Sequence, residues 1–116
     1  MNDQITLYDF KNDRIHINIV ARFENEDLII DGYDIGKTVE EAWGDSDYEY
    51  ILTIRREQVL SICQEFKTDV ADHSALLQEM AKRFQGNTCF SDIEKFLTER
   101  SIKYERFSWT WWLNRD

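Results

Sequence analysis

Apolar and polar residues alternate along residues 14–23, the clearest pattern in the first half of the chain. One side of this segment would present Ile15, Ile17, Ile19, Ala21 and Phe23. A period of two is typical of a strand that buries one face. Residues 4–10 and 28–31 are also β-prone, and turn-forming residues at 12–13 and 24–26 separate the three segments. The pattern predicts an antiparallel meander with one face toward solvent.

The chain then passes through one more strand and becomes helical. Residues 48–54 alternate, and their shared face would present Tyr48, Tyr50, Leu52 and Ile54. Apolar residues recur at helical spacing in 56–66 and again in 73–85. Gly86 is typical of the position just after a helix. We therefore expect two helices joined by a short connection.

Capping boxes indicate two further helix starts. Thr38 with Glu41 would open a short helix. Ser91 with Glu94 would open the third main helix, and residues 102–112 are again β-prone. This order predicts an α+β fold, a mostly antiparallel sheet of about five strands with three main helices packed on one face.

Length and composition fit one domain over residues 1–116. The chain is 42% hydrophobic and 14% aromatic, which is enough to build a core. No apolar run approaches the ~18 residues that a membrane helix needs. The N-terminus lacks the basic start and apolar stretch of a signal peptide. We expect a cytoplasmic protein whose two cysteines stay reduced.

The negative charge is concentrated in the first half of the chain. Of the net charge of −9, residues 1–50 contribute all, with 13 acidic and 4 basic side chains, while residues 51–116 carry 10 of each. An acidic surface repels phosphates, so we expect neither nucleic acid nor membrane as a partner. It would suit a basic protein partner, whose approach it would steer. The alternative is that the charge only maintains solubility.

The segment Gly-Asp-Ser-Asp-Tyr-Glu-Tyr, which leads into the fourth strand, is the most distinctive stretch of the chain. In an extended backbone Asp45, Asp47 and Glu49 share one face. With Asp31 and Asp34 they would form an acidic patch that binds a partner. The alternative is a turn with local side-chain hydrogen bonds, followed by a strand with an acidic solvent face.

This stretch resembles a family of small uncharacterised bacterial proteins. The likeness rests on Leu-Ile-Ile-Asp-Gly-Tyr-Asp-Ile-Gly at 28–36, Val-Glu-Glu at 39–41, and Gly-Asp-Ser-Asp-Tyr-Glu-Tyr-Ile-Leu-Thr at 44–53. It covers about residues 28–66. The family has no established activity, so the resemblance implies no site residues. In its acidic, aromatic-rich character the chain is also similar to immunity proteins that neutralise toxins.

Motifs for catalysis or for a metal are missing from the sequence. The acidic segment opens like an EF-hand loop, but Tyr50 stands at the glycine position and Arg56 at the last glutamate position. His16 and His73 have no cysteine at ligand spacing. No nucleophile elbow or phosphate loop is present. We predict no catalytic residue, metal or cofactor, and keep a small metal- or ligand-dependent enzyme as an alternative.

The C-terminal strand is rich in aromatic residues. If Phe107, Trp109 and Trp111 complete the core, then Trp112 faces outward. Exposed tryptophan is common at binding hot spots, and an edge strand pairs readily with a second chain. The leading hypothesis is a non-catalytic protein-binding protein of immunity type that uses the acidic patch, with Trp109, Trp111 and Trp112 as a second surface. A homodimer formed through this strand is the alternative.

Overall fold

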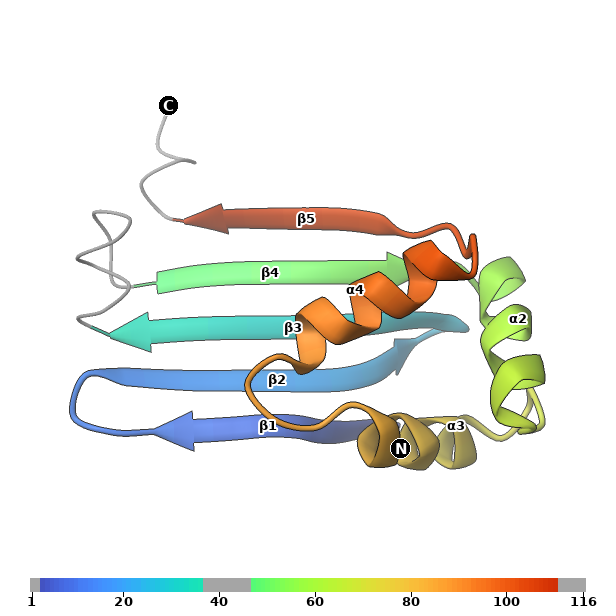
Figure 1. Ribbon diagram of the computed structural model, residues 1–116, viewed down its shortest axis with the longest axis horizontal. Helices are drawn as coiled ribbons and strands as arrows, with labels where there is room; N and C mark the ends of the chain where they lie inside the picture. Colours follow the sequence, from blue (N-terminus) through green and yellow to red (C-terminus); the bar gives the residue numbers. More distant parts are fainter. Residues whose placement is uncertain (1–2, 37–46, 111–116) are drawn as a thin grey trace.

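The computed structural model describes residues 3–36 and 47–110 and has an α+β fold. Its elements are β1 (Gln4–Lys11), β2 (Ile15–Glu24), β3 (Asp27–Gly36), β4 (Asp47–Ile54), α2 (Arg56–Phe66), α3 (His73–Arg83), α4 (Cys89–Glu99) and β5 (Glu105–Thr110). The strands form a five-stranded antiparallel sheet in the order β1-β2-β3-β4-β5 (Figure 1). The predicted fold class is confirmed. The helix expected after Thr38 lies outside the described residues.

Helices α3 and α4 cross one face of the sheet, while α2 lies at the end where β4 finishes (Figure 1). The alternation in β2 directs Ile19 and Ala21 toward these helices, where they are 2% and 0% exposed. The largest fully buried side chains of the core are Ile19, Leu28, Ile30, Leu52, Ile54, Ile62, Leu76, Met80, Ile93 and Leu97. They come from the strand and helix positions that the periodicity selects, because each element buries its apolar face against the other layer. None of the helices in the described part of the chain is long and apolar enough to cross a membrane.

Strand β3 continues through Gly36, well beyond the predicted 28–31, and Gly32 lies inside it. Its backbone is not in the left-handed region. A methyl group added at Gly32 would overlap the ring of Tyr50, its register partner on β4. Gly32 is therefore required for space and not for a turn, a reason that the sequence pattern alone does not distinguish.

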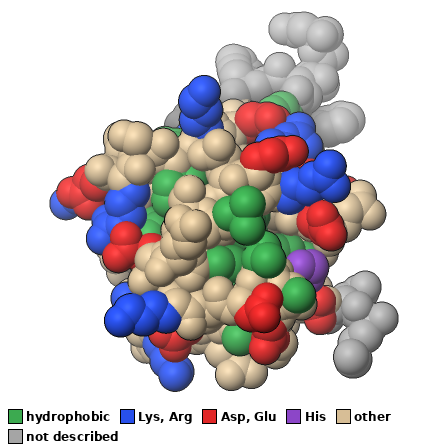
Figure 2. Space-filling model, turned by 90° about the vertical axis from the view of Figure 1, so that its right-hand side faces the viewer, with side chains coloured by type: hydrophobic (Ala, Val, Ile, Leu, Met, Phe, Trp, Pro, Cys, Tyr) green, Lys and Arg blue, Asp and Glu red, His purple; other side chains and the backbone are tan. Residues whose placement is uncertain are grey.

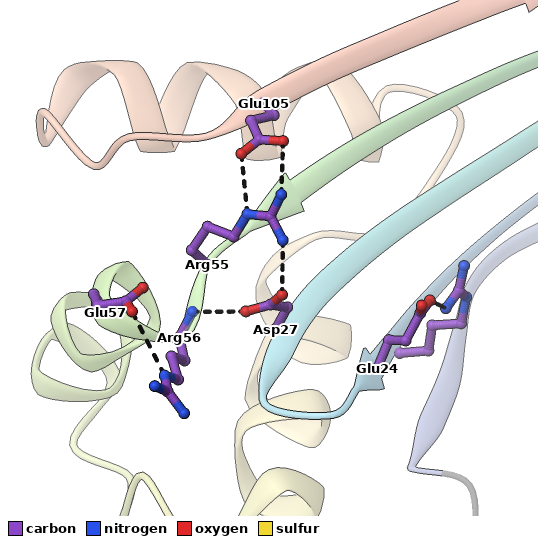
Figure 3. Close-up of polar contacts among 7 residues, drawn as sticks. Glu24, Asp27, Arg55, Arg56, Glu57 and Glu105 are labelled. Atoms are coloured by element: carbon purple, nitrogen blue, oxygen red, sulfur yellow. Dashed lines mark hydrogen bonds and ion pairs between the residues drawn. The ribbon is translucent and has the colours of Figure 1, made fainter.

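The first backbone N–H of helix α2 donates its hydrogen bond to a side chain of β3, far away in the sequence. Its N-cap residue, Arg55, makes no side-chain capping bond. Instead Asp27, at the start of β3, accepts the backbone N–H of Arg56 at 2.9 Å through one carboxylate oxygen. The other oxygen accepts from Arg55 at 3.0 Å, and Arg55 also donates two bonds to Glu105 (Figure 3). This cluster connects the beginnings of β3, α2 and β5.

The capping box expected at Ser91 does not form. Helix α4 begins at Cys89, with Thr88 as its N-cap residue, so Ser91 lies inside the first turn. The earlier start buries Cys89 and Phe90, which are 0% and 6% exposed. Burying these two side chains outweighs a local cap, because propensity and capping signals are weaker than tertiary packing.

Candidate functional site

The sheet face that points away from α3 and α4, here called the open face, is the candidate functional site. Strand alternation turns Val20 and Arg22 to this side, since Ile19 and Ala21 face the helices. The register then aligns a row across all five strands, which consists of Thr6, Val20, Asp31, Ile51 and Phe107. The next row consists of Asp9, Asn18, Tyr33, Glu49 and Trp109. Of Trp109 the structure describes the backbone position only.

Apolar side chains occupy the middle of the open face. Val20 and Ile51 are half-buried, Ile29 is only 6% exposed, and Phe107 is 53% exposed. Ile51 and Phe107 are register partners on β4 and β5, so they form a cross-strand pair. The solvent face of an antiparallel sheet is usually polar. We call these side chains the apolar strip, which Asp31 interrupts between Val20 and Ile51 in the register. Exposed apolar side chains on such a face are typical of a surface that another molecule covers.

Charged residues surround this strip. Arg22 donates to Glu24 at 2.8 Å and lies 3.5 Å from an oxygen of Asp31. The hydrogen bond from Arg22 to Glu24, more than the charge of Asp31, raises the pKa of the guanidinium. A shallow hollow of about 270 Å³ lies beside this pair, with Asp31, Tyr33 and Glu49 in its lining. The surface therefore combines an apolar centre with a charged border in which carboxylates outnumber the guanidinium groups of Arg22 and Arg55.

The predicted acidic patch is divided between the two faces of the sheet. Asp31 and Glu49 are on the open face. Asp47 is the register partner of Ile35 at the start of β4. Asp34 lies three residues after Asp31 on one strand, an odd spacing that places it on the helix-covered face. There its carboxylate accepts a hydrogen bond of 2.6 Å from the Tyr50 hydroxyl. Grouping Asp34 with Asp31 was therefore wrong.

Burial governs the chemistry of the Asp34–Tyr50 pair. Desolvation raises the pKa of Asp34, although the hydrogen bond from Tyr50 opposes the shift. Desolvation also raises the pKa of the Tyr50 phenol, and the Asp34 carboxylate adds to it. The phenol is thus a permanent donor and Asp34 its acceptor. The arrangement holds β3 against β4 from the core side.

The aromatic strand β5 directs Phe107 to the open face and not to the core. Phe107 faces the open side, whereas Ser108 pairs with Tyr50, whose ring packs in the core. The alternative in which Phe107 completes the core is therefore wrong. The core is already closed at this edge by Tyr50 and Phe90, whose rings meet edge to face at 4.7 Å. Asp45, Trp111 and Trp112 lie outside the described residues.

Each of the two histidines pairs with a carboxylate. His16 bonds to Asp9 at 2.8 Å, and His73 bonds to Asp3 at 3.2 Å while stacking on Phe23. Within residues 3–36 and 47–110, no three His, Cys, Asp or Glu side chains are grouped so as to hold a metal ion. The enzyme alternative stays a prediction without an assigned site.

The cysteines are buried and unpaired. Burial raises the pKa of the Cys89 thiol to about 11. A thiol with such a pKa is a poor nucleophile at neutral pH, because the thiolate is the reactive form. Cys63 is 4% exposed, so a reagent in solution reaches neither sulfur without local opening.

Sequence reasoning missed the apolar residues of the open face. Val20 and Ile51 were visible as apolar exceptions on the polar sides of β2 and β4, but Ile29 lies in a continuous apolar run whose two faces look alike. Asp31 and Glu49 were predicted and do lie on this face. The chain matches no protein-family model, and comparisons with curated proteins and with solved structures find no match.

Proposed function

We propose that the protein is a non-catalytic binding protein whose open face engages a protein partner. The observation that carries this proposal is the apolar strip of Val20, Ile51 and Phe107, which shares the sheet face that points away from α3 and α4 with the carboxylates of Asp31 and Glu49. Protein interfaces combine an apolar, aromatic centre with a polar rim. Phe107 is the side chain best placed to insert into a partner, since it is 53% exposed.

Charge favours a basic partner. The net charge is −9, and Asp31 and Glu49 border the strip. Such a surface accelerates encounter with a cation-rich protein and disfavours acidic competitors. A toxin-neutralising immunity protein is the most concrete form of this function. The two buried, unpaired cysteines support the cytoplasm as its compartment, because reduced thiols persist there.

A capture experiment with two matched variants tests the proposal. Phe107→Glu places a charge in the apolar strip, while Leu60→Glu changes a similarly exposed apolar side chain, 48% exposed, on α2. A partner of the open face is captured by the wild type and by Leu60→Glu, and is lost with Phe107→Glu. Its binding protects amide hydrogens of β4 and β5 from exchange. Capture that is equal for all three proteins would refute the assignment to this face.

Salt dependence tests the basic partner separately. Affinity for a cationic protein should fall as ionic strength rises, because surface charges are screened beyond ~8 Å at physiological salt. An affinity that stays constant from low to high salt would remove the electrostatic part of the proposal and leave the apolar part intact.

Self-association is a second candidate function. Strand β5 pairs with β4 alone in the described part of the sheet and forms its edge (Figure 1). An edge strand with an exposed aromatic side chain is able to pair with the same strand of a second copy. Sedimentation equilibrium at micromolar concentration should then show a dimer that Phe107→Glu dissociates. A strictly monomeric wild type would exclude this candidate.

A further inference from the structure

A second surface lies at the end of the molecule formed by α2 and the α2–α3 connection. It is a cavity of about 490 Å³, here called the α2–α3 groove. Its apolar lining consists of Val59, Leu60, Val70 and Ala71. None of these residues belongs to the open face, so the groove is independent of the function proposed above.

The apolar lining is exposed to an unusual degree. Leu60, on α2, is 48% exposed, and Val70, on the α2–α3 connection, is 45% exposed. Val59, the neighbour of Leu60 on α2, is 2% exposed and anchors the helix in the core. Figure 2 looks onto this end of the molecule and shows hydrophobic side chains at the surface between charged ones. The α2 side of the groove is therefore part of a helix that packs on the core.

Carboxylates outnumber cations at the rim. Glu26 and Glu57 share the single guanidinium of Arg56, at 3.4 and 3.5 Å. Both contacts are long, and both glutamates are more than half exposed. The three side chains together leave one negative charge beside the apolar lining. The sequence adds Asp69 and Asp72, one on each side of the Val70-Ala71 pair.

The inner wall of the groove is fixed. His73 stacks on Phe23 with ring centroids 3.8 Å apart and bonds to Asp3 at 3.2 Å. Asp72 caps α3 by accepting the backbone N–H of Ala75 at 3.0 Å. These contacts hold the α2–α3 connection in place, so a ligand would meet a preformed cavity and lose little entropy on ordering it.

We propose that the α2–α3 groove binds a short peptide segment of a protein partner in which an apolar residue stands next to lysine or arginine. The volume lies within the range of ~300–1,000 Å³ that is common for ligand sites. The aliphatic lining accommodates the apolar side chain, and the cation meets Glu26 and Glu57 at the rim. An acidic neighbour would instead face these glutamates and be repelled. Charge complementarity therefore defines the class of peptide.

Nuclear magnetic resonance titration of the full chain tests this proposal with three capped tetrapeptides. The first has two leucines between two lysines, the second has glutamates in place of the lysines, and the third has serines in place of the leucines. The lysine–leucine peptide should shift the amides of Leu60, Val70 and Ala71 in a saturable manner. The glutamate peptide should bind at least about tenfold more weakly, which corresponds to ~1.4 kcal/mol. The serine peptide should not saturate.

Variants separate the groove from the rest of the surface. Leu60→Ser should weaken binding of the lysine–leucine peptide, and Val70→Ser serves if the first variant loses its native spectrum. The double variant Glu26→Gln, Glu57→Gln should lose the preference for the basic peptide. Phe107→Glu should bind as the wild type does. Equal affinity for the basic and acidic peptides, shifts confined to the open face, or no saturation by about 10 mM peptide would each overturn the proposal.

Discussion

Removal of the Asp27 carboxylate should destabilise the protein more than removal of an ordinary surface carboxylate. The Asp27 side chain is 25% exposed and lies at the start of β3. Its carboxylate accepts the hydrogen bond that the first backbone N–H of α2, that of Arg56, donates. It therefore acts as an N-cap supplied by another element. Loss of such a cap costs ~1 kcal/mol, and loss of a negative charge near a helix N-terminus costs a further ~0.3–1 kcal/mol. The pair with Arg55 adds little, because Arg55 is exposed to solvent.

We therefore expect Asp27→Ala to lower the free energy of unfolding by about 1–2 kcal/mol. Asp27→Asn keeps an oxygen acceptor for the Arg56 amide and should lose only the charge contribution. Glu24→Ala is the matched control, since Glu24 also pairs with an arginine but caps no helix. Urea unfolding followed by circular dichroism measures all three. Equal effects of Asp27→Ala and Glu24→Ala would refute the capping role.

Three further predictions concern the interior. Gly32→Ala should destabilise the protein by ~1–3 kcal/mol in urea unfolding, because the added methyl overlaps the Tyr50 ring, and an unchanged midpoint would contradict this packing. Asp34→Asn should equal or exceed wild-type stability at neutral pH, since the raised pKa of Asp34 means that folding disfavours its charged form. The difference in unfolding free energy between Asp34→Asn and the wild type should shrink as pH falls through that pKa and Asp34 becomes neutral. A difference that grows as pH falls would contradict a raised pKa of Asp34. A thiol reagent at pH 8 should label Cys63 and Cys89 only as fast as the protein opens, so immediate labelling of both would show that they are not buried.

The open face and the α2–α3 groove have similar chemistry at two separate places. Each sets exposed aliphatic or aromatic side chains beside carboxylates. Phe107→Glu and Leu60→Glu are therefore reciprocal controls, because each alters one surface and leaves the other unchanged. A partner that binds neither variant would contact both surfaces. A partner that fails to bind only one variant would have its site on the surface which that variant alters.

The sequence alone determined the elements with a strong period. The alternation in residues 14–23 and the helical spacing in 56–66 predicted β2 and α2, because one face of each must be buried whatever lies against it. The order of these elements was enough to predict the α+β class. Asp31 and Glu49 were also identified from the sequence as members of an exposed acidic face.

Tertiary structure decided every question that depends on which face is covered. Strand β3 is apolar on both faces at its centre, so the sequence does not tell which of its sides the helices take, whereas the face predicted for β4 is the buried one. The packing of the helices on one face separated Asp34 from Asp31 and turned Phe107 outward, and the burial of Cys89 and Phe90 moved the start of α4 from Ser91 to Cys89. Tertiary structure also replaced the missing local cap of α2 with Asp27, which lies 29 positions away in the chain. Local patterns specify period and polarity, whereas contacts between distant segments select the buried face, because the free energy of burial is shared by the whole core.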